Sequence, residues 1–175
     1  MENVKASSKK IIINYGILLG IVSVLLGVVM YVTNAYKDPN WIYSVIGFVV
    51  LIGVISYGIK AFKTANNGYL ILMDAIKIGL GIALIGGIIG AIWSFTLTNV
   101  IEPDYTQQML EVQREKMIEQ YPDFSQEQID QSMAIAEKFS APFVSIALSI
   151  IASLFFGFII SLIAGLVMQK KQDLY

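Results

Sequence analysis

Four long runs of apolar residues limit what this chain can fold into. They cover residues 11–33, 41–59, 76–98 and 142–168, and Lys77 is the one charged residue among them. Each run is close to or above the roughly 20 residues that a helix needs to cross about 30 Å of hydrocarbon. Inside a bilayer the backbone must satisfy its own hydrogen bonds, which a helix does. The sequence therefore predicts an all-α membrane protein with four transmembrane helices.

The composition and the start of the chain agree with this prediction. Hydrophobic residues make up 56% of the 175 residues and the mean hydropathy is +0.68, whereas soluble domains are about 45–50% apolar. Lysines precede the first run, as in a signal peptide. The run is longer than the roughly 7–15 apolar residues of a signal peptide, and no small-x-small cleavage site follows it. We therefore expect an uncleaved first span and a single membrane domain over residues 1–175.

Basic residues are unequally divided between the two ends of the predicted bundle. Eight of the twelve lie at the end that holds both termini and the 60–77 loop: Lys5, Lys9, Lys10, Lys60, Lys63, Lys77, Lys170 and Lys171. Lysine and arginine are enriched in cytoplasmic loops. The distribution therefore predicts that both termini are cytoplasmic and that residues 99–141 face the other side of the membrane.

Residues 99–141 form the one long polar segment, between the third and fourth runs. Asp104 is placed to cap a first helix, and Pro122 to end it. Ser125 and Gln128 have the spacing of a capping box, which predicts a second helix. Nine acidic and three basic residues give the segment a net charge of −6. We expect an extracytoplasmic amphipathic helical hairpin over residues 104–139.

The first helix of this hairpin has an apolar stripe opposite an acidic row. The residues are Leu110, Met117 and Tyr121 in the stripe, and Glu111, Glu115 and Glu119 in the row. Isolated helices shorter than about 12–15 residues are marginal in water. The stripe must therefore face the rest of the hairpin, the membrane surface or another protein. These six residues are the candidates for binding a partner, and packing within the protein itself is the alternative.

Small residues recur at every fourth position in the last two apolar runs. They are Gly79, Ala83, Gly87 and Ala91 in the third run, and Ser145, Ser149, Ser153, Gly157, Ser161 and Gly165 in the fourth. Helices in lipid associate through close packing of small residues, and a four-residue repeat favours a right-handed crossing. The pattern predicts that the third and fourth spans pack closely on each other, or that one of them packs on a second copy of the chain.

The chemistry-bearing residue types are largely missing. The chain has no cysteine and no histidine, which excludes disulfides and thiolate metal sites and removes the commonest general base. No charged residue lies in a span interior, where transporters usually keep one. Asp74 and Lys77 are three residues apart at the start of the third span, and we interpret them as an interfacial pair that anchors the helix. We expect no enzyme activity, no cofactor, no metal and no nucleic acid.

Short motifs along the whole length resemble a known family. They are Tyr15-Gly16 in the first span, the Asn67-Gly68-Tyr69 turn, residues 74–79 entering the third span, and the long helical insert before the last span. The chain resembles a bacterial family of small integral membrane proteins of unknown function, numbered forty-one ninety-nine in the domain-of-unknown-function series. The resemblance implies a multi-pass protein of the bacterial inner membrane with four spans, and it supplies no catalytic residues.

Two functions of different classes fit these features. The first is a non-enzymatic subunit, scaffold or assembly factor, whose 99–141 segment binds a membrane protein, an extracytoplasmic protein or another copy of the chain. The second is a transporter or channel for small solutes or ions, with a path lined by the serines of the fourth span. A dry centre filled by small residues would favour the first, and a wet cavity lined by Ser149 and Ser153 would favour the second.

Overall fold

The computed structural model describes residues 7–35 and 40–170, and within them the chain is helical with no strand. In chain order the elements are α1 (Ser8–Val32), α2 (Trp41–Ala65), α3 (Leu72–Thr96), the π-helical segment η1 (Leu97–Ile101), α4 (Tyr105–Gln120), α5 (Gln126–Ser140) and α6 (Pro142–Met168). α1, α2, α3 with η1, and α6 are long and apolar enough to span a membrane. The prediction of an all-α chain with four spans is confirmed. Lys5 and Lys171, two of the lysines on which the predicted orientation depends, lie outside the described residues.

The outer surface of these four helices is apolar. Trp41 is 74% exposed, Phe143 83% and Val167 79%. In water such a surface would be unfavourable, because burying apolar area is worth roughly 25 cal/mol per Å². The protein is therefore a multi-pass membrane protein whose spans contact lipid.

Three spans are longer than the apolar runs that predicted them, and the difference is largest for α2 and α3. α2 continues past residue 59 to Ala65, and α3 begins at Leu72 and continues through η1 to Ile101. The charged residues at the ends of these runs mark the edge of the hydrocarbon layer, but the helices continue past them. Lysine side chains near a helix end can extend to the membrane interface, so they do not stop the helix. The Asn66-Asn67-Gly68 turn stops α2, with Asn67 at φ 56° and Gly68 at φ 83°, in the left-handed region that ends many helices.

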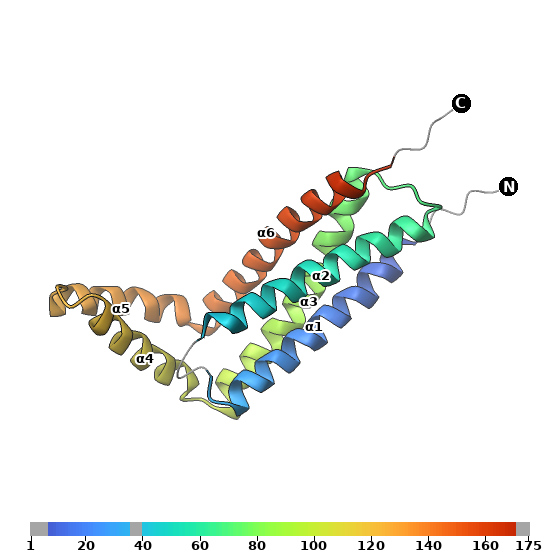
Figure 1. Cartoon of the computed structure of the whole chain (residues 1–175). Helices are drawn as coiled ribbons and strands as arrows, with labels where there is room; N and C mark the ends of the chain where they lie inside the picture. Colours follow the sequence, from blue (N-terminus) through green and yellow to red (C-terminus); the bar gives the residue numbers. More distant parts are fainter. Residues whose placement is uncertain (1–6, 36–39, 171–175) are drawn as a thin grey trace.

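Helix α3 is the centre of the bundle. It packs against α1 along one side and against α6 along another, and α2 lies over all three (Figure 1). α1 and α3 run in the same direction, and α2 and α6 run in the opposite one. Because α3 contacts every other span, it carries more of the buried residues than any of them.

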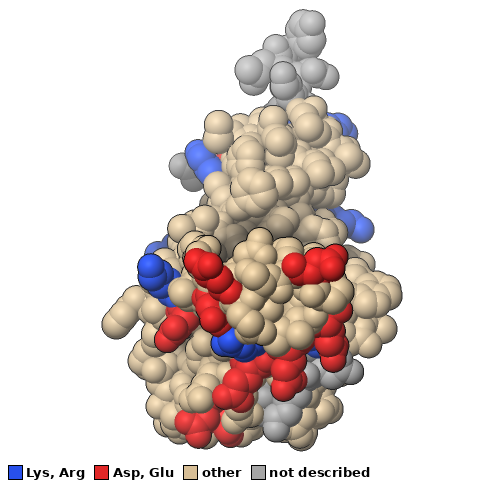
Figure 2. All heavy atoms as spheres, turned by 90° about the vertical axis from the view of Figure 1, so that its left-hand side faces the viewer, with Lys and Arg blue, Asp and Glu red and all other residues tan. Residues whose placement is uncertain are grey.

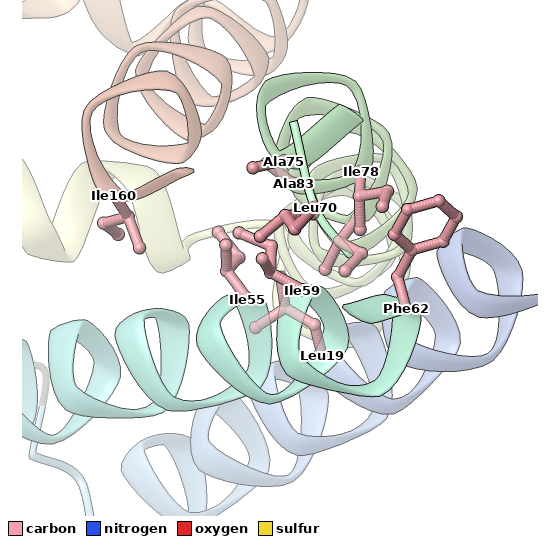
Figure 3. Close-up of a cluster of buried hydrophobic side chains, with 10 residues drawn as sticks. Leu19, Ile55, Ile59, Phe62, Leu70, Ala75, Ile78, Ala83 and Ile160 are labelled. Atoms are coloured by element: carbon pink, nitrogen blue, oxygen red, sulfur yellow. The ribbon is translucent and has the colours of Figure 1, made fainter. Parts of the chain in front are cut away.

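A cluster of buried side chains joins all four spans near the end that holds the termini (Figure 3). Ile55, Ile59, Ile78 and Ile82 are completely buried in it. Leu70, from the loop before α3, is also completely buried. Its backbone forms an antiparallel bridge with Lys170, with both N–H···O distances at 2.9 Å. The chain after α6 is thereby tied to the α2–α3 loop.

The α4–α5 hairpin extends sideways from the opposite end of the bundle (Figure 1). Ser125 and Gln128 form the predicted capping box, with Gln128 N donating to Ser125 Oγ at 3.3 Å and Ser125 N to Gln128 Oε1 at 2.9 Å. The predicted cap at Asp104 is wrong in its chemistry. Asp104 occupies the N-cap position but its side chain caps nothing, and its backbone is already helical, with φ −82° and ψ −3°, whereas a capping side chain needs an extended N-cap residue.

Candidate functional site

The contact between α3 and α6 brings together most of the small residues that the sequence singled out. Ala83 lies against Gly157, and a Cβ built on Gly157 would lie 2.5 Å from the Cβ of Ala83. One turn on, a Cβ on Gly87 would lie 3.0 Å from the Oγ of Ser153. Ser153 donates a hydrogen bond of 2.8 Å to the backbone oxygen of Ala83, on the other helix. The two backbones approach so closely because neither side contributes a large side chain.

The same contact continues toward the termini. Gly79 lies against Ser161, which is completely buried and donates to the carbonyl oxygen of Phe158 in its own helix at 3.0 Å. Gly165 lies against Ala75 and Leu72. The antiparallel register pairs Gly79, Ala83 and Gly87 of the α3 row with Ser161, Gly157 and Ser153 of the α6 row, respectively. A row of small side chains therefore fills the centre of this interface.

Toward the hairpin the two helices separate, and the row on α6 loses its partner. Ser149 is exposed and donates to the carbonyl oxygen of Ile146 at 2.8 Å, and Ser145 donates to that of Pro142 at 3.2 Å. On α3, a Cβ on Gly90 would meet nothing within 4 Å, whereas Ala91 is 7% exposed. The structure thus brings Ser153, Gly157, Ser161 and Gly165 to α3, but leaves Ser149 exposed and Ser145 half-buried.

A second close interface, between α1 and α3, was not assigned from the sequence. Gly16 of α1 lies against Ile85 of α3, and Gly20 lies against Ile89 one turn further. Here glycines on one helix receive isoleucines from the other. The four-residue spacing of Gly16 and Gly20 was the signal for this interface, but it carries no information on which helix is the partner.

Asp74 and Lys77, which the sequence predicts to be an interfacial pair, lie near the start of α3 without an ion pair between them. Asp74 lies half-buried in the first turn of α3, where the helix dipole favours an acid. Lys77 is exposed. Between described residues the one ion pair within 4 Å joins Arg114 of α4 to Asp130 of α5, at 2.5 Å. Three-residue spacing allows an ion pair on a helix but does not require one, since exposed pairs gain only about 0–1 kcal/mol.

The six candidate partner-binding residues all lie on α4 or at its end, in different surroundings. Leu110 and Met117 are half-buried and Tyr121 is 50% exposed. Leu110 lines a cleft at the root of the hairpin, whereas Met117 and Tyr121 line a groove of about 370 Å³ along α4 toward the tip. Tyr121 stacks on Phe124, with ring centroids 4.9 Å apart. The predicted stripe is therefore divided between the root and the tip.

The acidic row on α4 faces solvent. Glu111, Glu115 and Glu119 are all exposed, and the Gln107 amide donates to Glu111 Oε1 at 3.2 Å. Figure 2 looks at the hairpin from its free end and shows many acidic side chains on this face with few basic ones among them. The hairpin therefore presents a strongly negative surface to its surroundings.

Glu102, at the root of the hairpin, was not among the candidate residues predicted from the sequence. Its half-buried carboxylate accepts hydrogen bonds from the Tyr31 hydroxyl and from the Gln108 amide, each at 3.1 Å. These bonds link the end of α1 to the start of α4. No local pattern signals such a contact, because Tyr31 and Glu102 are 71 residues apart.

The cleft at the hairpin root, between the start of α4 and the end of α5, has a volume of about 670 Å³. Its hydroxyl and amide groups are bonded locally, with Thr98 donating to Ser94 O at 2.9 Å and Ser140 to Ala136 O at 2.9 Å. In the described part of the chain no three His, Cys, Asp or Glu residues are grouped to hold a metal ion. The cleft therefore offers shape and polar oxygens, and the hydroxyls of Thr98 and Ser140 are engaged by backbone oxygens of their own helices.

No curated protein and no solved structure matches this chain. A family model described as a protein of unknown function, DUF4199, matches residues 14–170. The match covers the first span from residue 14, the other three spans and the hairpin. It includes the Tyr15-Gly16, Asn67-Gly68-Tyr69 and 74–79 motifs on which the resemblance rested. The chain therefore belongs to the DUF4199 family of proteins of unknown function.

Proposed function

We propose that the protein is a non-enzymatic membrane subunit or scaffold, which binds a basic protein partner through the outer face and tip of the α4–α5 hairpin. The spans anchor it in a bacterial inner membrane. Both termini lie in the cytoplasm and the hairpin lies on the other side. The proposal assigns no catalytic residue and no cofactor.

The observation that carries the proposal is the surface at the free end of the hairpin. The acidic row on α4 adjoins three exposed apolar side chains: Ile118 (43%), Tyr121 (50%) and Phe124 (40%). Aromatic residues surrounded by charged ones are typical of protein interfaces, in which a few large side chains supply most of the binding energy. The negative charge favours a basic partner and speeds its approach.

The orientation is supported by the lysines at the other end of the bundle. Lys60 and Lys63 lie in the last turns of α2, and Lys77 is exposed near the start of α3. Lys170 follows α6 at the same end. Positive charge close to span ends favours retention in the cytoplasm. The hairpin then emerges on the extracytoplasmic side.

The structure gives less support to a solute path along the fourth span. Ser153 and Ser161 are packed against α3 and their hydroxyls donate to backbone oxygens. Ser149 and Ser145 also donate to their own helix. In membrane helices serines commonly act as such packing and hydrogen-bonding groups. The interface at the centre of the bundle is closed by small residues and not by water-accessible hydroxyls.

The proposal is tested by removing the acidic row while keeping its shape. The triple variant Glu111→Gln, Glu115→Gln, Glu119→Gln removes three like charges spaced four residues apart, so the fold should be retained or slightly stabilised. Proteins cross-linked to the chain in native membranes should be lost in this variant, and the loss should be mimicked by added salt, because exposed charges are screened over about 8–10 Å.

A matched control keeps the proposal falsifiable. The variant Glu137→Gln neutralises an acid of α5 at the hairpin root and should leave the cross-linked partner in place. Deleting residues 104–139 and bridging the ends with a short flexible linker should remove the partner and leave a bundle that still inserts. If a well-folded deletion variant cross-links to the same proteins as the full chain, the hairpin is not the binding surface, and the transporter alternative gains the preference.

A further inference from the structure

Helix α5 has two apolar faces, and one of them is uncovered. Ile129 is 2% exposed within the hairpin, and Met133 and Ala136 continue that face as half-buried residues. Ile135 and Phe139 lie one turn apart on a different face, and they are 56% and 54% exposed. Packing between α4 and α5 therefore explains the first face and leaves the second without a partner in the described part of the chain.

The uncovered face carries no acidic residue, although the hairpin is acidic overall. Asp130 and Glu137 lie about 140° and 160° around the helix from Ile135, from the 100° turn per residue of an α-helix. Asp130 is held there by its ion pair with Arg114. Lys138 precedes Phe139 and is exposed. An apolar strip with a lysine at its edge, and with the nearby acids Asp130 and Glu137 on the far side, is typical of helices that lie on a membrane surface.

The connection to α6 determines what lies beside this strip. α5 ends at Ser140 and α6 begins at Pro142, so Ala141 is the whole connection. Phe139 is four residues from Phe143, which is 83% exposed on a helix that spans the membrane. Four extended residues reach at most about 14 Å. The headgroup layer on each side of the hydrocarbon is about 5–8 Å thick. Phe139 therefore lies close to the level of the lipid headgroups.

The direction of the hairpin agrees with this placement. α5 leaves the start of α6 and extends sideways from the bundle (Figure 1). A helix in this position runs across the lipid that surrounds the bundle instead of standing on top of the bundle. The lipid-exposed surface of α6, beginning at Phe143, thus continues into the exposed face of α5.

We propose that α5 lies on the surface of the bilayer that the chain spans, with Ile135 and Phe139 inserted among the lipid headgroups. Lys138 reaches the lipid phosphates. The occupant of the uncovered face is lipid, and neither a second copy of the chain nor a soluble partner covers it. The inference does not depend on the proposed function, because it uses a different face of a different helix and leaves the acidic row on α4 free.

Site-directed spin labelling tests this placement in the full-length chain, which has no native cysteine. Single variants Ile135→Cys and Phe139→Cys would be labelled in vesicles of phosphatidylethanolamine and phosphatidylglycerol. Collision rates with oxygen, which enriches in lipid, and with a water-soluble nickel chelate would then be measured. Glu137→Cys is the matched control, since it lies on the same turns of α5 but on the opposite side. Phe143→Cys is the lipid-embedded reference.

We expect a several-fold higher ratio of oxygen to nickel collisions at residues 135 and 139 than at residue 137, and a value approaching that at residue 143. Nickel accessibility at 135 and 139 equal to that at 137 would place the face in water and overturn the proposal. Protection from both reagents at 135 and 139 would show protein on this face, and would overturn it equally. Because the labelled side chains are exposed, the labels should leave the fold intact, and near-native circular dichroism checks this.

Discussion

Replacing Gly157 with alanine should destabilise the bundle by an amount that the structure allows us to specify. The new Cβ would lie 2.5 Å from the Cβ of Ala83, whereas two carbon atoms in good contact are about 3.5–4.0 Å apart. The next neighbours, the Gly79 oxygen at 3.6 Å and the Ala83 Cα at 3.9 Å, are at ordinary contact distances. A single methyl group therefore accounts for the overlap, and α3 and α6 must separate by about 1 Å to relieve it.

Overpacking of this kind costs about 1–3 kcal/mol of unfolding free energy. The matched control is Gly90→Ala on α3, where a Cβ meets nothing within 4 Å. Since alanine is favoured over glycine in a helix by about 0.8–1 kcal/mol, this control should be neutral or slightly stabilising. The two glycine-to-alanine variants should therefore differ in stability by at least about 1–3 kcal/mol.

The double variant Gly157→Ala, Ala83→Gly moves the methyl group from α3 to α6. It should recover most of the stability lost in Gly157→Ala, with a coupling energy within the roughly 0.5–3 kcal/mol found for residues in contact. Unfolding free energies come from titration with dodecyl sulfate in mixed micelles, followed by circular dichroism. If Gly157→Ala unfolds like Gly90→Ala, or if the two changes are additive, the α3–α6 contact is not limited by these methyl groups and the reasoning fails.

Two further predictions concern orientation and the bridge after α6. Cysteine placed at Gln113 should react with an impermeant thiol reagent added to spheroplasts and cysteine at Lys63 should not; labelling at Lys63 alone would invert the proposed orientation. Lys170→Pro removes the N–H that donates to the buried Leu70 oxygen and should cost about 1–3 kcal/mol, whereas Lys170→Ala keeps that bond and should cost less. Equal losses in the same micelle titration would show that the bridge does not contribute.

The spans were predictable because a bilayer leaves few alternatives. An apolar run of this length has to satisfy its own backbone hydrogen bonds, so α1 and α6 could be read from the sequence almost to their ends. The ends of the spans were harder to predict where charged residues lie among apolar ones. Lys60 and Lys63 marked an end of α2, but the helix continues to the Asn67-Gly68 turn, since lysine is a good helix former.

The packing of the spans was only partly predictable. A four-residue repeat of small residues shows that a helix has a surface on which another helix can pack closely. It does not show which helix packs there or how far the contact extends. Gly16 and Gly20 therefore gave no indication of α3 as their neighbour. Likewise the serine row on α6 continues without interruption to Ser145, although the helices separate beyond Ser153. The contact ends there because the two helices cross at an angle, and the sequence repeat carries no information on that angle.

The polar contacts at the ends of the bundle could not be predicted. The Glu102 carboxylate meets Tyr31 across 71 residues of sequence, and Leu70 pairs with Lys170 through backbone atoms, which any residue could supply. By contrast, the Ser125–Gln128 capping box is local, so its spacing was sufficient to predict it.

The central position of α3 also determines the order in which the helix contacts form during synthesis and membrane insertion. A chain is threaded into the membrane from its N-terminus as it is synthesised, so α1 and α2 are available when α3 arrives, and the parallel α1–α3 contact can form at once. The face of α3 that carries Gly79, Ala83 and Gly87 has to wait, because α6 emerges only after the whole acidic hairpin has been made. During that interval the small-residue face of α3 is in contact with lipid or with the insertion machinery. The nascent bundle is closed by α6, and the pairing of Lys170 with Leu70 then completes assembly.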